Sequence, residues 1–245
     1  MTRMTRRALA ALGTLPPLAA AAQPAAHVFA AGAVKTAVES LLAGQAWTAR
    51  FGTVGALRDA VMAGARPRVV LLSDEAIARL EAAGLVVPGS RRPVGRTGVA
   101  LATRAGAPLP DIATAEALRA ALLATPSFAY ADPARGATAG AHIARVLDRL
   151  GIAEAMRAKS RLVPFGVEGV DLAAAGEVAL AASQASEITG RPGVALVGFL
   201  PDALQLWTGY GMAALRDAPD AGPLLDLFTS AAARHAFNES GFVPP

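Results

Sequence analysis

Residues 131–151 combine a proline turn, several small side chains and an amphipathic pattern, which together suit the binding of an anion. The stretch reads ADPARGATAGAHIARVLDRLG, and its apolar residues recur at helical spacing, so a helix is predicted to begin near Thr138. A helix start presents unpaired backbone N–H groups, and small residues such as Gly136 and Ala137 let a ligand reach them. We therefore predict ligand contacts from Gly136, Ala137 and Thr138, with Arg135 clamping a carboxylate or standing in solvent.

Three titratable side chains are candidates for moving a proton, and each also has a structural interpretation. Asp132 could cap the turn, as could Thr138. His142 lies one turn into the predicted helix beside apolar residues, where it could simply pack. Glu187 could stabilise a helix start, or act as a base if it is buried at a cleft. The three histidines lack the spacing of metal ligands, so neither a metal nor a cofactor is expected.

The positioning elements alternate between strand and helix in the first third of the chain. Strands are predicted at 27–33, 47–51 and 68–73, each followed by a helix, at 34–44, 56–64 and 74–84. Such βα units imply a parallel sheet with helices on both faces. Lys35 falls in the first turn of its helix, where a cation opposes the helix dipole, so it either faces a bound anion or is exposed.

A second α/β series follows. Strands are predicted at 97–103, 127–132, 161–165 and 177–183, and helices at 114–124 (capped by Thr114), after the anion loop and near 169–175. Residues 193–215 hold two strands around Pro201, and residues 224–237 are helical. The fold class is therefore α/β, with lobe 1 at 26–99 plus 205–245, lobe 2 at 103–198, and hinge strands near 99–103 and 198–205. Ligands in such sheets bind beyond the carboxyl ends of strands, which predicts a cleft between the lobes.

Composition limits the class of protein. The chain has 245 residues, is 53% hydrophobic and contains no cysteine, which excludes a disordered protein, disulfides and thiolate sites. Residues 1–22 place three arginines before a short apolar run and end in alanines, which predicts a secretory signal peptide of the Sec or twin-arginine type. Its removal lowers the formal charge from +4 to +1. No basic stripe with interleaved aromatic residues is present, so nucleic acid is not an expected partner.

Several motifs together resemble the periplasmic molybdate-type solute-binding proteins of ABC transporters. They are VFAAGAVKTAV (28–38), FGTVGAL (51–57), RVVLLSDEAIARLEAAGLV (68–86) and ADPARGATAG followed by VLDRLGI (131–152). The resemblance implies a type II periplasmic binding protein fold that closes on a small anion by hinge motion. It also implies that the anion is held by backbone N–H groups and hydroxyls. By correspondence with the family, the ligand-binding candidates in the first two turns are Gly32, Ala33, Thr53, Val54 and Gly55.

The chain departs from the molybdate-binding pattern in its ligand turns. The family generally has a serine after the first AA, a run of serines in the second turn and a tyrosine near residues 182–183, whereas this chain has Gly32–Ala33, a single hydroxyl at Thr53 and no such tyrosine. The string SQASEITGRPGVALVGFLP (183–201) instead resembles a divergent branch that includes aconitate isomerase. This branch adds Gln184, Ser186 and Glu187 as candidates and favours an organic carboxylate over molybdate.

Two functions follow from the resemblance. The first is a monomeric periplasmic binding protein that captures a small anion and delivers it to a membrane ABC permease. The second is an isomerase of the aconitate type, which shifts an allylic proton in a small tricarboxylate and would use Glu187, His142 or Asp132 as the proton-transferring group. The identity of the anion and the choice between carrier and enzyme stay open at this point.

Overall fold

The computed structural model describes residues 26–218 and 220–245, and the predicted signal peptide lies outside them. Lobe 1 is our name for the elements around the first apolar core. Its strands are β1 (Val28–Ala31), β2 (Ala49–Gly52) and β3 (Val69–Ser73). Its helices are η1 (Gly32–Val34), α1 (Lys35–Leu42), α2 (Val54–Met62), α3 (Asp74–Ala82), α9 (Gly222–Thr229) and α10 (Ala231–Glu239).

Lobe 2 is our name for the elements between the two long strands that the lobes share. Its strands are β5 (Phe128–Ala131), β6 (Ser160–Val163), β7 (Leu180–Gln184) and β8 (Val194–Phe199). Its helices are α4 (Ala115–Ala124), η2 (Pro133–Arg135), α5 (Thr138–Arg149), α6 (Ala153–Arg157), α7 (Gly166–Ala175), α8 (Ala185–Ile188) and η3 (Asp202–Leu204). The shared strands are β4 (Arg92–Arg104) and β9 (Trp207–Ala214).

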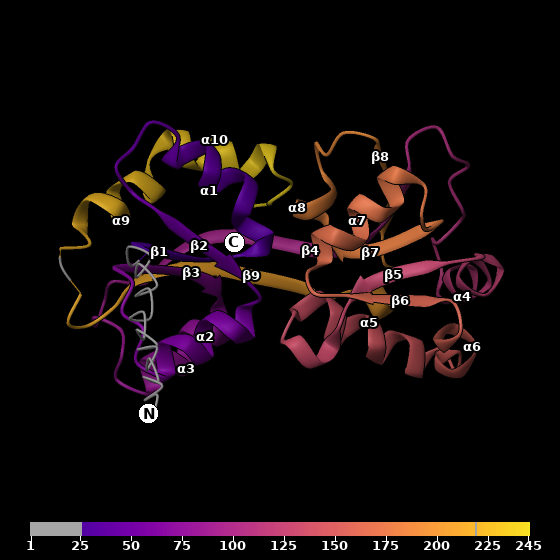
Figure 1. The fold of residues 1–245 in the computed structure, drawn as a ribbon, viewed down its shortest axis with the longest axis horizontal. Helices are drawn as coiled ribbons and strands as arrows, with labels where there is room; N and C mark the ends of the chain where they lie inside the picture. Colours follow the sequence, from indigo (N-terminus) through magenta and orange to yellow (C-terminus); the bar gives the residue numbers. More distant parts are fainter. Residues whose placement is uncertain (1–25, 219) are drawn as a thin grey trace, which may run out of the picture.

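One sheet runs through both lobes in the order β2-β1-β3-β9-β4-β7-β5-β6, with β8 also paired to β4 (Figure 1). The strands β2, β1 and β3 are parallel, as are β7, β5 and β6, whereas β9 and β4 pair antiparallel with each other and with their outer neighbours. The first half of β4 pairs with β9 and its second half with β7 and β8. The lobes are therefore joined by continuous strands, and the α/β fold class predicted from the sequence is confirmed.

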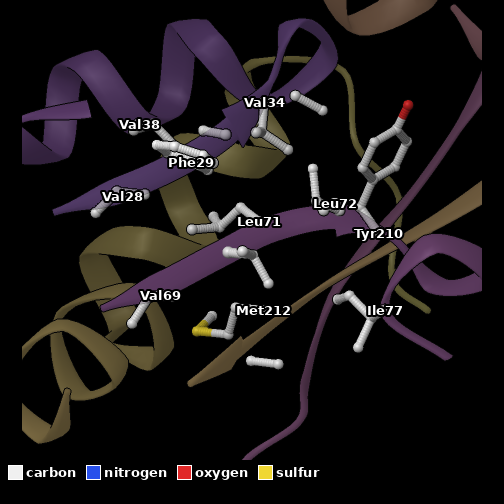
Figure 2. Packing of buried hydrophobic residues seen from close by; sticks show 14 of the residues in the cluster. Val28, Phe29, Val34, Val38, Val69, Leu71, Leu72, Ile77, Tyr210 and Met212 are labelled. Carbon is white, nitrogen blue, oxygen red and sulfur yellow. The ribbon is translucent and has the colours of Figure 1, made fainter. Parts of the chain in front are cut away.

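Helices cover both faces of the sheet. In lobe 1, α1 and α10 lie on one face and α2 and α3 on the other; in lobe 2, α7 and α8 lie opposite α5 and α6 (Figure 1). The core of lobe 1 is built from apolar side chains of β1 and β3, from Tyr210 and Met212 of β9, and from the helices packed on them (Figure 2). Lobe 2 has its own apolar clusters. No helix in residues 26–218 and 220–245 is long and apolar enough to cross a membrane.

Two predicted helices differ from the structure, and two short helices were not predicted. The helix expected at 224–237 is split into α9 and α10, because Ser230 takes an extended conformation and its Oγ accepts from Ala233 N to cap α10 (3.1 Å). The helix expected near 169–175 begins three residues earlier, at Gly166, because Pro164 and Phe165 already end the preceding strand. The short α6 and α8 carry too few residues to show a period and were not predicted.

Candidate ligand-binding site

A cavity of about 40 Å³ lies where the two lobes meet. Lobe 1 contributes the starts of η1 and α2, lobe 2 contributes the starts of α5, α7 and α8, and β9 contributes Tyr210. These elements meet because each follows the carboxyl end of a strand of the common sheet. The lining residues are Ala31, Gly32, Ala33, Gly52, Thr53, Val54, Ala131, Ala137, Thr138, Ala139, Phe165, Gly166, Gln184, Glu187 and Tyr210.

Four of the five helix starts at the cavity have no side-chain cap. The N-cap residues of η1, α5, α7 and α8 are Ala31, Ala137, Phe165 and Gln184, and none of their side chains accepts from the helix. The fifth, α2, is capped by Thr53. Away from the cavity, a serine or threonine hydroxyl caps α3, α4 and α10, whereas α6 and α9 have no side-chain cap. Uncapped helix starts keep free N–H donors, so the cavity is lined by donors suited to an anion.

Glu187 places one carboxyl group among these donors. It is the third residue of α8, and Ser183 Oγ at the end of β7 donates a hydrogen bond to its Oε2. Burial raises the pKa of the Glu187 carboxyl, against the opposing effects of the hydrogen bonds from Ser183 and the backbone of Gln184 and of the positive charge of Arg191. A carboxyl whose pKa is raised takes up a proton more readily than an ordinary glutamate, so Glu187 is a candidate to hold or transfer a proton in the cavity.

Tyr210 and Gln184 form a polar group beside Glu187. Tyr210 is buried in β9, and its hydroxyl points away from the apolar core of lobe 1 (Figure 2). Burial raises the pKa of the Tyr210 hydroxyl, as does the nearby Glu187, so the hydroxyl stays protonated. Gln184 Nε2 donates to Thr208 Oγ1 (3.3 Å). Within the described part of the chain Gln184 Oε1 has no hydrogen-bond partner, so this buried amide keeps unused capacity at the cavity.

A seam of direct contacts between the lobes closes one side of the cavity. Thr53 Oγ1 donates to the carbonyl of Arg135 (2.6 Å), and Gly55 N donates to the carbonyl of Gly136 (3.1 Å). Gly55 and Gly136 touch through bare backbone: a Cβ on Gly55 would stand 3.0 Å from Gly136 Cα. Gly136 has φ +75°, a conformation that favours glycine. At this seam the two lobes meet through backbone groups and one hydroxyl.

A larger groove of about 630 Å³ lies on the outer side of this seam. It shares Gly52, Thr53 and Phe165 with the cavity and adds the side chains of Arg50, Arg58 and Arg135. Arg58 is paired with Asp59 (2.7 Å), and Arg50 stacks over the ring of Phe29. Because three arginines and one aspartate line the groove, it carries net positive charge next to the seam.

The structure brings most of the predicted ligand-binding residues to the cavity or its seam. Eight of the sequence candidates line the cavity: Gly32, Ala33, Thr53, Val54, Ala137, Thr138, Gln184 and Glu187. Gly55, Arg135 and Gly136 line the outer groove and form the seam, so the Arg135 side chain is placed outside the cavity. Thr138 is the first residue of α5 and does not cap it.

Four candidates lie elsewhere. Lys35 Nζ points to Glu39 (3.7 Å) and the ring of Phe51, because η1 inserts a tight turn before α1 and rotates this side chain away from the cavity. His142 Nε2 hydrogen-bonds to the carbonyl of Leu204 (2.7 Å), and burial lowers its pKa, as expected for a packing histidine.

The other two serve local structure. Asp132 Oδ1 accepts from Ala134 N (2.9 Å) and so caps η2. Ser186 is buried, and its N–H donates to Thr97 Oγ1 (3.3 Å); it does not line the cavity.

Seven of the fifteen lining residues were not among the sequence candidates. Four of them, Ala31, Gly52, Ala131 and Ala139, each lie next to a predicted candidate in the chain. The other three come from elements whose positions were not predicted. Phe165 and Gly166 open α7, whose start was placed later in the sequence. Tyr210 comes from β9, which enters the sheet beside β3 and pairs Tyr210 with Ser73. The sequence held one signal for Tyr210, which is one of only two tyrosines in the chain and lies between two glycines of its strand.

Replacing Thr53 by valine is expected to weaken ligand binding several-fold. The change removes one hydrogen bond of the seam, which is worth about 1 kcal/mol. It also removes the cap of α2, because Thr53 Oγ1 accepts from Ala56 N (3.2 Å). Thr53→Ser keeps the hydroxyl and serves as the control. Calorimetric dissociation constants of both variants measure the effect, and equal affinity of the valine and serine variants would contradict it.

Comparisons with known proteins show the family and the fold. Residues 18–243 match the family model described as bacterial extracellular solute-binding protein. A curated relative, aconitate isomerase from Pseudomonas sp., is 35% identical over 180 residues, covering 72% of this chain and 67% of the relative. The periplasmic molybdate-binding protein of Azotobacter vinelandii has a similar fold, with a TM-score of 0.73 and 19% identity over 89% of this chain and 98% of that one.

A further solved structure, PEB3 of Campylobacter jejuni with L-phospholactate bound, has a TM-score of 0.64 and 16% identity, covering 90% of this chain and 100% of that one. At these identities the two solved structures show the fold, while the family match spans nearly the whole chain. The chain belongs to the bacterial extracellular solute-binding protein family.

Proposed function

We propose that the mature protein is a periplasmic binding protein that captures a small organic carboxylate between its lobes and delivers it to a membrane ABC permease. The observation that carries this proposal is the convergence of uncapped helix starts from both lobes on one cavity. Free N–H donors at helix starts bind anions without a charged side chain. At about 40 Å³ the cavity has room for a single carboxylate group of the ligand.

The lining favours a carboxylate over a tetrahedral oxyanion. Only three lining side chains carry a hydroxyl, namely Thr53, Thr138 and Tyr210, and that of Thr53 is already used in the seam. Glu187 adds a carboxyl that can meet a second carboxyl through a shared proton. The name of one relative points the same way, since it is an aconitate isomerase.

Capture requires the lobes to move apart and close again. We propose that the moving bodies are those expected from the sequence, 26–99 plus 205–245 against 103–198. The shared strands β4 and β9 support this hinge, because β4 changes its pairing partners between residues 98 and 100. The seam at Thr53 and Gly55 would open as they bend.

A thermal-shift screen tests the ligand class. A ligand at about 100 times its dissociation constant adds about 2.7 kcal/mol of stability, which raises the Tm of a protein of this size by roughly 5–10 °C. We expect such a shift with at least one acid from a panel of mono-, di- and tricarboxylates, and none with molybdate, tungstate or sulfate. A response to molybdate alone would overturn the proposed ligand class.

A second function, isomerisation of a small unsaturated tricarboxylate, is favoured by the position of Glu187 in the cavity. In its ionised form Glu187 would remove a proton from the carbon next to the double bond and return it at the far end of the allylic system, leaving the atoms of the acid unchanged in number. The N–H donors at the helix starts would stabilise the negative charge that develops on the carboxylate.

Incubation of the protein with trans-aconitate, followed by detection of the cis isomer, separates the two functions. An enzyme is expected to show turnover that rises with pH, because the reaction needs the ionised form of a carboxyl whose pKa is raised. Turnover is also expected to be lost in Glu187→Gln. Binding without any conversion would leave the carrier as the function.

A further inference from the structure

The carboxyl of Glu187 is enclosed by backbone from both lobes. A Cβ added to Gly32 of lobe 1 would stand 2.8 Å from Oε1, and a Cβ added to Gly166 of lobe 2 would stand 2.7 Å from Oε2. The absence of side chains at both glycines is what allows this close approach. Because Gly32 belongs to the opposite lobe, half of this enclosure exists only while the lobes are together.

Closing the lobes therefore changes the surroundings of Glu187 in two ways. It replaces water by the backbone of η1, and it brings a bound anion into the same small cavity. Loss of water and a neighbouring negative charge both disfavour the ionised form of a carboxyl. An ionised Glu187 would repel the ligand, whereas a protonated Glu187 would donate a hydrogen bond to it.

We propose that closure on a carboxylate ligand takes up one proton at Glu187, which makes this residue a proton-linked determinant of ligand affinity. This inference rests on the proposed binding of an anion in the cavity. The protein is therefore expected to bind its ligand more tightly at lower pH. Affinity is full below the pKa of the open form, where Glu187 is already protonated, and it is lost as the pH rises from there through the pKa of the closed form.

Few charged side chains on the elements packed against α8 could take up this proton in place of Glu187. Of the elements packed against α8, the strands β7 and β8 and the turn η1 carry no titratable side chain. Arg191 follows α8 and favours the ionised form of Glu187, but it is paired with Asp171 of α7 (2.5 Å). Tyr210 of β9 is uncharged. The remaining charged residues of packed elements are Glu168 on α7 and the arginines 92, 96 and 104 on β4.

Calorimetric titration in buffers of different ionisation enthalpy measures the proton directly. The probe is the carboxylate that gives the largest thermal shift, titrated at about pH 6, between the ordinary pKa of a glutamate and neutrality. The wild-type protein is expected to take up close to one proton per ligand. Glu187→Gln mimics the protonated acid and keeps the length of the side chain, so it is expected to bind without proton uptake. Glu116→Gln, an exposed glutamate at the start of α4, is the matched control and keeps the uptake.

The pH dependence of wild-type affinity gives a second readout that needs no variant. Uptake of one proton predicts an affinity that falls by up to tenfold per pH unit between the pKa of the open form and the higher pKa of the closed form, and that levels off above the latter. At pH 8 the Glu187→Gln variant is expected to bind more tightly than the wild type. Binding with no proton uptake and no pH dependence would overturn this inference and leave the proposed function intact. Uptake that persists in Glu187→Gln would place the proton on the ligand and also overturn it. Absence of any carboxylate binding would instead refute the proposed function.

Discussion

Replacing Gly140 by alanine is expected to lower the free energy of unfolding by about 3 kcal/mol and the Tm by roughly 6–12 °C. Gly140 lies in the first turn of α5, which packs directly on the end of β5. A Cβ at this position would stand 2.1 Å from the carbonyl oxygen of Ala131, a backbone atom that cannot rotate away. The helix would have to move, and its start at residues 137–139 lines the cavity. Weaker ligand binding is therefore expected as well.

Gly169→Ala is the matched control for this substitution. Gly169 is also a buried glycine in a helix, α7, and also packs on β5, but its added Cβ would stand 3.4 Å from Ala129 Cβ, an ordinary contact. Alanine is favoured over glycine inside a helix, so this variant should be as stable as the wild type or up to about 1 kcal/mol more stable. Chemical denaturation of both variants measures the difference. Equal stability of the two would contradict the assigned clash.

The second large effect is expected from Gly55→Ala, which should weaken ligand binding tenfold or more while leaving each lobe folded. Gly55 lies in the first turn of α2 with an ordinary helical conformation, so alanine causes no strain within lobe 1. Its Cβ would meet Gly136 across the seam, 3.0 Å from Cα and 3.2 Å from the carbonyl oxygen. The closed form then loses both the contact and the hydrogen bond from Gly55 N to Gly136 O, at a cost of about 1.4 kcal/mol or more.

Dissociation constants and small-angle scattering together test this prediction. The variant is expected to keep the stability of the wild type in the absence of ligand and to show a larger radius of gyration in its presence. Unchanged affinity would mean that the seam does not form in the complex and that the ligand extends through it into the outer groove.

Much of the fold was predictable because the chain alternates strongly between short apolar runs and amphipathic helices. The loop before Thr138 could be proposed as a ligand site from its own residues, since small side chains there precede a helix start. Gly32, Thr53 and Glu187 became candidates through the resemblance to the family, and the structure places all three at the cavity. The local pattern alone did not single them out.

The residues that sequence could not place depend on contacts between distant segments. Tyr210 reaches the cavity because β9 inserts antiparallel between β3 and β4, a pairing that no local pattern specifies. Lys35 and His142 were plausible by position within their helices, but the rotation of α1 after η1 and the docking of η3 against α5 direct them elsewhere. Packing decides how a helix is rotated about its own axis. The 3.6-residue period of the sequence does not determine this rotation for residues near the helix ends.

The uncapped helix starts have a consequence for how this scaffold diverges. Among substitutions only proline removes a backbone N–H, so the general attraction for negative charge persists in descendants that keep these helix starts free of proline. A change of ligand must therefore come from the few side chains that occupy the rest of the cavity. A single substitution at a position such as Gly32 or Glu187 can change which ligand is bound and leave the fold unchanged. Related proteins with this fold can therefore come to bind chemically different ligands, because only a few side chains decide the choice.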